Sequence, residues 1–96
     1  MKAVYPVILT PVDQGFVVSV PDLSINTEGA DLADAIAMAR DAIGICGITE
    51  QDFGWDIPAA SPWESISYEP GEIVTLVDID FDKYRRANNT KIIQNG

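Results

Sequence analysis

The sequence contains no histidine and only one cysteine, Cys46, and these absences exclude several kinds of site. Without histidine, the common zinc sites cannot be assembled and no imidazole is present to activate a nucleophile. A single cysteine permits no disulfide within the chain, and Cys46 falls on an apolar helical stripe, as a buried structural thiol would. We therefore expect no catalytic residues, no metal, no cofactor and no enzymatic activity.

Basic residues are also scarce, because 15 acidic side chains stand against 6 basic ones and the formal net charge is -9. Such a balance repels phosphate backbones and attracts basic surfaces. Binding of DNA or RNA through a broad basic face is therefore disfavoured. A basic protein partner is one interpretation of the acidity, and the other is that the charge simply keeps a small domain in solution.

No apolar run approaches the roughly 20 residues that cross a bilayer, and the first residues lack the pattern of a secretory signal. We therefore expect a cytoplasmic protein with no membrane segment. The 96 residues, 47% of them apolar, suffice for one hydrophobic core and are too few for two independent domains.

Apolar patterning and turn residues predict three strands, a helix and a fourth strand. The strands cover residues 3–10, 16–20, 24–28 and 72–81, and the helix begins after Asp31 as its N-cap and ends at Gly47. The order β-β-β-α-β predicts an α+β fold in which one main helix packs on one face of a four-stranded mixed sheet. The sheet is mixed in this prediction because a helical crossover favours parallel pairing of the last strand with the first, central strand.

The segment between the helix and the last strand, residues 48–71, is interrupted by prolines and glycines and cannot form a long regular element. It carries both tryptophans, Trp55 and Trp63. Long connections inside small domains are often functional, so this segment is a candidate contact surface. The alternative is that at least one tryptophan folds back to cover the edge of the sheet.

Asp78, Asp80 and Asp82 alternate as at the start of a calcium-binding loop. The sixth position of that loop is Lys83 where glycine is required, and the twelfth is Asn89 where glutamate is required. A calcium site of the EF-hand type is therefore excluded. The period of two instead predicts three carboxylates on one face of a strand, either solvated or offered to a basic partner.

Several segments, in their order and spacing, resemble the HicB antitoxin family over residues 3–86. They are Tyr5-Pro6-Val7-Ile8, Gly15-Phe16-Val17-Val18, Val20-Pro21-Asp22-Leu23, Thr27-Glu28-Gly29 and the helix that starts at Leu32-Ala33-Asp34-Ala35. The resemblance implies a partial ribonuclease-H-like fold, with residues 1–86 as the antitoxin domain and residues 87–96 as a flexible tail. Residues 3–10 contain no acid, which argues against two-metal nuclease chemistry in such a fold.

The resemblance also implies a function. HicB-type antitoxins of type II toxin–antitoxin systems bind and neutralise HicA, a small basic toxin that cleaves mRNA, and they commonly form homo-oligomers. The acidic composition fits such a partner. We expect the contacts to come from loops and strand ends near residues 48–71, namely Asp22, Glu28, Asp52, Trp55 and Trp63.

Two departures from the family pattern limit the resemblance. Ser24-Ile25-Asn26 stands where many members have Pro-Gly-Cys, and the chain stops soon after Arg86, where a DNA-binding domain usually follows. We therefore do not expect operator binding by this chain. The alternative function is RNA binding without catalysis, through the basic residues Arg85, Arg86 and Lys91 near the C-terminus.

Overall fold

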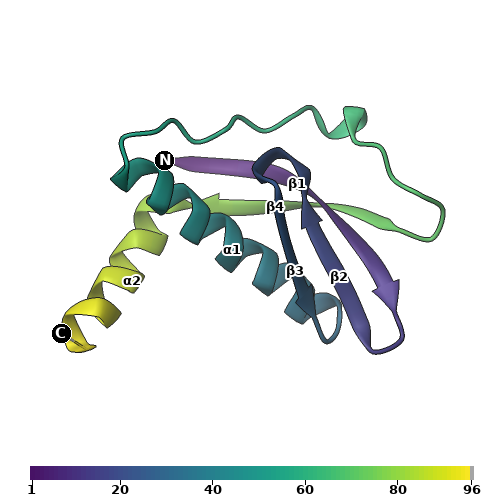
Figure 1. Ribbon diagram of the computed structural model, residues 1–96, viewed down its shortest axis with the longest axis horizontal. Helices are drawn as coiled ribbons and strands as arrows, with labels where there is room; N and C mark the ends of the chain where they lie inside the picture. The colour runs from purple at the N-terminus through teal and green to yellow at the C-terminus, as the bar shows by residue number, and fades with distance from the viewer. Residues whose placement is uncertain (96) are drawn as a thin grey trace.

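The computed structural model describes residues 1–95, with side chains described as far as Asn88. Four strands and two helices follow one another in the order shown in Figure 1. They are β1 (Lys2–Val12), β2 (Gly15–Val20), β3 (Ile25–Gly29), α1 (Leu32–Asp52), β4 (Ile73–Asp80) and α2 (Phe81–Asn95), with short 3-10 turns η1 (Pro21–Leu23) and η2 (Trp63–Ser65). None of these helices is long and apolar enough to cross a membrane.

The strand order is β3-β2-β1-β4, so the prediction that the first strand is central and adjacent to the last is confirmed. The predicted parallel pairing, and with it the mixed sheet, is wrong. β4 runs antiparallel to β1, with Leu9 opposite Ile73 and Lys2 opposite Asp80. The reason is the segment after α1, residues 53–72, here called the connector. It runs back along the molecule, so that β4 starts beside the end of β1 and not beside its beginning (Figure 1).

Pro6 and Pro11 lie on the central strand β1, although proline is normally excluded from central strands. β2 pairs with β1 only from Ile8 onward, and β4 pairs with β1 only as far as Leu9. Each proline therefore has one side without a partner strand. Val12 and Gly15 flank the two-residue hairpin turn as a hydrogen-bonded pair, so even-numbered residues of β1 direct their backbone groups toward β2 and odd-numbered ones toward β4. The nitrogens of Pro6 and Pro11 therefore each face the side without a partner strand. No ladder hydrogen bond is lost.

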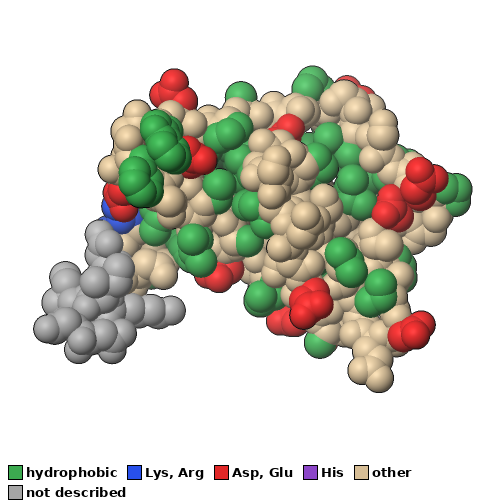
Figure 2. All heavy atoms as spheres, viewed as in Figure 1, with side chains coloured by type: hydrophobic (Ala, Val, Ile, Leu, Met, Phe, Trp, Pro, Cys, Tyr) green, Lys and Arg blue, Asp and Glu red, His purple; other side chains and the backbone are tan. Residues whose placement is uncertain are grey.

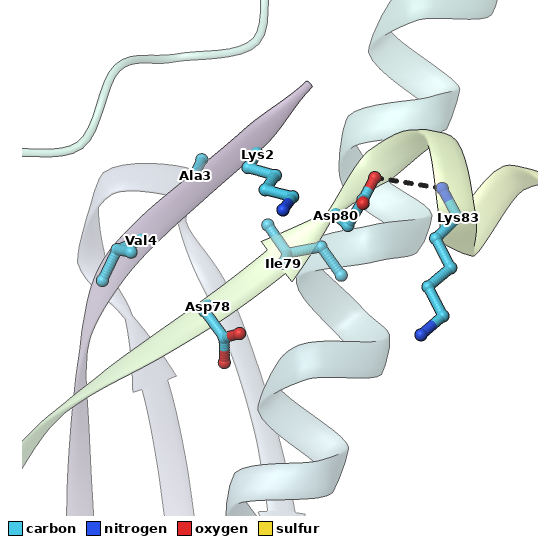
Figure 3. A pocket seen from close by; sticks show the side chains of 7 residues that line it. All are labelled: Lys2, Ala3, Val4, Asp78, Ile79, Asp80 and Lys83. Carbon is cyan, nitrogen blue, oxygen red and sulfur yellow. Dashed lines mark hydrogen bonds between the residues drawn. The ribbon is translucent and has the colours of Figure 1, made fainter.

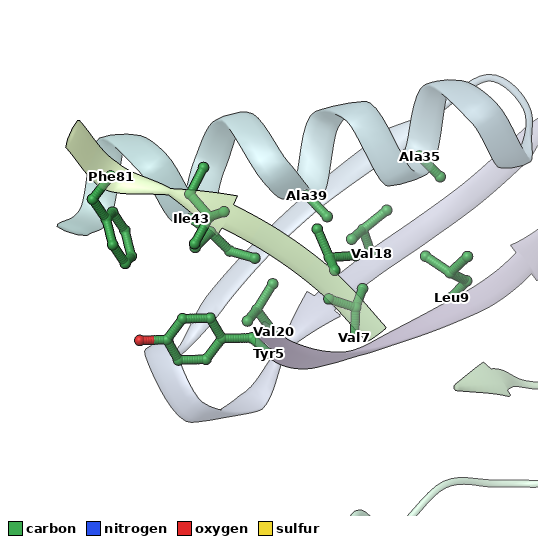
Figure 4. Close-up of a cluster of buried hydrophobic side chains, with 11 residues drawn as sticks. Tyr5, Val7, Leu9, Val18, Val20, Ala35, Ala39, Ile43 and Phe81 are labelled. Carbon is green, nitrogen blue, oxygen red and sulfur yellow. The ribbon is translucent and has the colours of Figure 1, made fainter. Parts of the chain in front are cut away.

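The hydrophobic core lies between α1 and one face of the sheet, as predicted (Figure 4). The helix contributes Ala35, Ala39 and Ile43, whose spacing forms the apolar stripe. The strands contribute fully buried larger side chains, among them Tyr5, Val7, Leu9, Val18, Val20 and Val77. The predicted N-cap is confirmed, because the Asp31 carboxylate accepts a hydrogen bond of 2.8 Å from the backbone N–H of Asp34.

The end of α1 differs from the prediction, since the helix continues through Gly47 to Asp52. Gly44 and Gly47 serve close packing and not a helix cap. A Cβ atom on Gly47 would lie 2.1 Å from Cε1 of Phe81, and one on Gly44 would lie 2.4 Å from Cδ1 of Tyr84. The two glycines therefore allow the aromatic rings of α2 to pack against the backbone of α1.

The C-terminal segment also differs from the prediction. β4 ends at Asp80, whose carboxylate accepts a hydrogen bond of 3.1 Å from the N–H of Lys83 in the first turn of α2. Asp82 is therefore a helix residue, paired with the N-terminal amino group, and shares no strand face with Asp78 and Asp80. Residues 87–95 continue the helix. The domain boundary at residue 86 and the flexibility of the tail stay predictions, and Gly96 lies outside the described residues.

Tyr84 links the two helices, because its hydroxyl donates a hydrogen bond of 2.8 Å to Asp41. Burial, together with this bond, raises the pKa of Tyr84 to about 12. The folded chain thus holds the phenol protonated. Its contribution to stability is complete below the ordinary pKa of about 10 and is lost as the pH rises from there to about 12.

We expect Tyr84→Phe to lower the free energy of unfolding at neutral pH by about 0.5–1.5 kcal/mol, the usual value of one hydrogen bond. The variant should also lose less stability than the wild type between pH 10 and pH 12. Urea unfolding at several pH values measures both effects. An unchanged alkaline loss of stability in the variant would contradict the assignment to Tyr84.

Candidate functional site

Large aromatic side chains are exposed along the connector. Phe53, Trp55, Trp63 and Tyr68 have 66%, 61%, 61% and 59% of their surfaces exposed. Figure 2 shows hydrophobic side chains at the surface along the top of the view, where the connector runs in Figure 1. Scattered exposed apolar residues are common, but several large aromatic residues on one segment make the connector a candidate binding surface.

Hydrogen bonds to residues of β1 and η1 hold this connector in place. The Tyr5 hydroxyl donates to the carbonyl of Pro58 at 2.8 Å. The Asp22 carboxylate accepts from both the backbone N–H of Ser61, at 2.8 Å, and the Ser61 hydroxyl. A segment without strand or long helix is thereby held in one place on a rigid sheet, which lowers the entropy that binding would otherwise cost.

Glu72 fastens the far end of the connector. Its carboxylate accepts hydrogen bonds from the N–H of Glu69, at 2.7 Å, and from the hydroxyl of Thr10, at 2.6 Å. Both bonds lower the pKa of Glu72, and the bond from Glu69 has the larger effect. The side chain is therefore a fixed negative charge at neutral pH.

A hollow of about 440 Å³ lies beside this fixed charge. Its walls are aromatic, apolar and acidic. They come from Trp63, Glu64, Ile66 and Tyr68 of the connector, Glu72 and Val74. The hollow therefore combines exposed rings with negative charge and contains no basic side chain.

A second hollow, at the start of β1 and the end of β4, has a different chemistry (Figure 3). Asp80 is turned to the first turn of α2, while Asp78 lies apart from it along β4. Arg40 forms an ion pair of 2.9 Å with the Asp78 carboxylate. The hydrogen bond from Arg40 is the largest cause of the lowered pKa of Asp78. The carboxylates here already have partners, and among the described residues no group of three or more acid or cysteine side chains is placed to hold a metal.

Cys46 is half-buried on α1. Burial, with a smaller contribution from the charge of Glu50, raises the pKa of its thiol. The thiol is therefore held in its protonated form, which is the weakly nucleophilic one.

The structure places the five predicted contact residues in different settings. Trp55 stacks on Phe53 with ring centroids 5.0 Å apart, and Trp63 lies in η2 beside the hollow. Neither tryptophan is buried against the sheet edge. Asp22 supports the connector through Ser61, whose backbone N–H and hydroxyl each donate to one of its carboxylate oxygens.

The other two predicted contacts lie apart from the hollow. Asp52 forms an ion pair of 2.9 Å with Arg85, which ties the end of α1 to α2. Glu28 is exposed on β3, the edge of the sheet opposite β4. All five residues stay predictions as partner contacts, but only the two tryptophans lie on the exposed face of the connector.

The residues of this surface that were not predicted from the sequence include Phe53, Glu64, Ile66, Tyr68 and Glu72. One signal was present in the sequence: no lysine or arginine occurs between Arg40 and Lys83, so the acids of the connector have no basic neighbour along the chain. The second signal was that these aromatic residues fall outside the apolar strand and helix patterns and therefore have no place in the core.

We expect Asp22→Ala to release the middle of the connector, because both bonds to Ser61 are lost. Hydrogen bonds to a charged group contribute about 1.5–3 kcal/mol, so the free energy of unfolding should fall by an amount of that order. Limited proteolysis should cut residues 53–72 faster than in the wild type. The matched control, Asp13→Ala on the exposed hairpin turn, removes the same charge and should be cut at the wild-type rate. Equal cutting of Asp22→Ala and wild type would contradict the fastening role.

Comparison with known proteins places this chain in a family. A family model described as HicB-like antitoxin of a bacterial toxin–antitoxin system matches residues 5–93. An uncharacterised 14.9 kDa protein from the rep-hol intergenic region of Haemophilus phage HP1 (strain HP1c1) is 37% identical over 82 residues. That match covers 79% of this chain and 60% of the phage protein, so the chain spans less than two thirds of that relative's length.

Solved structures show the same architecture. The chain is similar to a chain of a toxin–antitoxin complex from Streptococcus pneumoniae, with a TM-score of 0.79, 20% identity, and coverage of 88% of this chain and 73% of that one. It is also similar to a chain of the HicA3 and HicB3 toxin–antitoxin complex, with a TM-score of 0.65, 25% identity, and coverage of 80% and 98%. The family model matches most of the sequence and agrees with the resemblance found from its motifs, so this chain belongs to the HicB-like antitoxin family.

Proposed function

We propose that this chain acts as the antitoxin of a type II toxin–antitoxin pair, by binding and neutralising a small basic HicA-like toxin. The observation that carries the proposal is the connector, a fastened segment that presents exposed aromatic rings among acidic side chains. Family membership and the similarity to a chain of the HicA3 and HicB3 complex support this partner class.

The chemistry of the connector suits a basic protein. Acidic side chains without basic neighbours attract a positively charged surface from a distance and speed its association. Buried aromatic anchors supply most of the affinity once the two surfaces meet. Trp55 and Trp63 are such anchors, since each is largely exposed before binding.

RNA binding, the alternative, is less well supported. Arg85 is directed back to α1, where it pairs with Asp52 and donates to the carbonyl of Ile48. Arg86 also has an interaction partner, and the side chain of Lys91 lies outside the described part of the chain. The basic residues near the C-terminus therefore do not form a free surface for phosphates within the part that the structure describes.

The same proposal includes three further properties. The chain neutralises its partner by covering it and not by catalysis, because the thiol is protonated and the carboxylates beside α2 already have partners. It acts in the cytoplasm, where an mRNA-cleaving toxin has its substrate. It also associates with copies of itself, as the family resemblance implies, which sedimentation of the purified chain tests.

Co-expression tests the proposed function. A small basic toxin encoded by the reading frame beside this gene should arrest growth of a bacterial host when produced alone. Production of this chain together with the toxin should restore growth, and the two proteins should co-purify. The outcome against the proposal is continued growth arrest, without co-purification, in cells that contain the folded chain.

A further inference from the structure

β4 forms one edge of the sheet, and the direction of its free backbone groups can be deduced. In the order β3-β2-β1-β4, β4 has a neighbour strand on one side only. The carbonyl of Asp78 accepts a hydrogen bond of 2.9 Å from Nε of Arg40, a side chain of α1. A carbonyl occupied in this way points away from β1, so Asp78 directs its backbone groups outward.

Backbone direction alternates along a strand, so Val74 and Leu76 direct their N–H and C=O groups outward as Asp78 does. Neither residue makes a backbone hydrogen bond outside the β1–β4 ladder in the described part of the chain. The side chain of Leu76 is also half exposed. An edge with open donors and acceptors is a template for an additional strand.

The acidic hollow of the connector adjoins this open stretch, because Val74 lines it. Its aromatic rings, Trp63 and Tyr68, fit the aliphatic stem and the cation of a lysine or arginine side chain. Its carboxylates, Glu64 and Glu72, fit the charged head group. Glu72 is held in place by its bonds to Thr10 and Glu69, so the hollow is preformed on its acidic side.

We propose that the open edge of β4 at Val74 and Leu76 receives an extended basic segment of the partner protein as an added strand, with one lysine or arginine side chain in the adjoining hollow. This inference rests on the proposed function, because the toxin is the partner that supplies the segment. In this mode of recognition, main-chain hydrogen bonds provide affinity and side-chain pockets provide specificity.

A second copy of this chain fits the edge less well. Two β4 strands side by side would bring Glu72, Asp78 and Asp80 of one copy near the same residues of the other. Like charges on neighbouring strands are destabilising. Arg40 also occupies the carbonyl of Asp78. The open stretch of β4 is therefore limited to the part near Val74, next to the acidic hollow. The charge and the position of the open stretch both favour a foreign basic segment.

Leu76→Pro tests the edge, because proline removes one outward N–H and is tolerated where that group faces solvent. We expect it to weaken binding of the purified toxin about 10- to 100-fold, since an added strand loses a main-chain bond and meets the proline ring. The matched control is Asn26→Pro, which removes an outward N–H from β3 on the opposite edge. The control should bind the toxin within about twofold of the wild type.

Amide hydrogen exchange of the wild-type chain gives a second readout that requires no variant to fold. The amides of Val74 and Leu76 should exchange rapidly in the free chain and become protected in the complex with the toxin. The edge inference would be overturned if the toxin bound without protecting these amides and the Leu76→Pro variant bound the toxin with wild-type affinity. The proposed function would then still stand. Absence of toxin binding by the wild type would instead contradict the proposed function. Protection that appears in the free chain and rises with its concentration would assign the edge to a second copy and overturn the inference.

Discussion

Trp63→Ala is expected to weaken toxin binding by about 2 kcal/mol or more, which is roughly a 30-fold rise in Kd. The indole is 61% exposed in the free chain and lines the hollow together with Glu64, Tyr68 and Glu72, where a partner would bury it. Because the side chain contributes little to the core, the free energy of unfolding should change by only about 0.5 kcal/mol. Calorimetric titration with toxin and urea unfolding separate the two effects.

A matched control for this variant is Leu32→Ala in the first turn of α1. Leu32 is also exposed, at 47%, but it lies on a different element from the connector. It should bind toxin with wild-type affinity. If Trp63→Ala and Leu32→Ala both bound like the wild type, the interface would lie away from the hollow and the assignment of Trp63 as an anchor would be wrong.

Gly47→Ala is expected to destabilise the fold by about 1–3 kcal/mol, the usual cost of overpacking. In an exposed helix the same substitution would add stability of about 1 kcal/mol, because alanine is the better helix former. At this position the new methyl group would lie 2.1 Å from the ring of Phe81, which is fully buried. The steric effect therefore outweighs helix propensity and reverses the sign of the expected change.

A double-mutant cycle with Phe81→Leu assigns the effect to this contact. The smaller side chain at position 81 should relieve the overlap, so that the loss caused by Gly47→Ala is smaller in the Phe81→Leu background than in the wild type. Urea unfolding of the four proteins measures the cycle. A Gly47→Ala variant more stable than the wild type would show that the ring of Phe81 does not lie against this turn of α1.

The elements with strong local signals were predictable from the sequence. The hairpin of the first two strands follows from two β-prone runs around a turn, and the third strand follows after Pro21. Asp31 as N-cap and the stripe of Ala35, Ala39 and Ile43 follow from helix chemistry alone. Each of these features depends on residues close together along the chain.

The features that the sequence did not predict depend on contacts between distant segments. Glycine near the end of an apolar stripe is compatible with a helix cap and with close packing, and only the position of Phe81 decides between them at Gly47. The direction of β4 depends on how far the connector runs before the chain turns into the strand. The helix after Asp80 was missed because its sequence is polar and carries no clear apolar stripe.

The candidate site was predictable in outline and not in detail. The proline-rich segment with its tryptophans indicated the correct region, because exposed aromatic residues have no place in the core pattern. The acids were harder to assign. A carboxylate in a turn or at the end of a helix can bind a partner protein or another residue of its own chain. Asp22 binds Ser61 and Asp52 binds Arg85, so both are engaged within the chain.

Binding of a basic toxin to the connector of this acidic chain can be measured by sedimentation of the purified chain with the purified toxin at low and at high salt. We expect a complex that weakens as salt rises, because acidic side chains steer and hold a basic partner. The same experiment with Trp63→Ala should show a weaker complex at both salt concentrations. Absence of a complex at low salt, with both proteins folded, would contradict binding of the toxin by this chain.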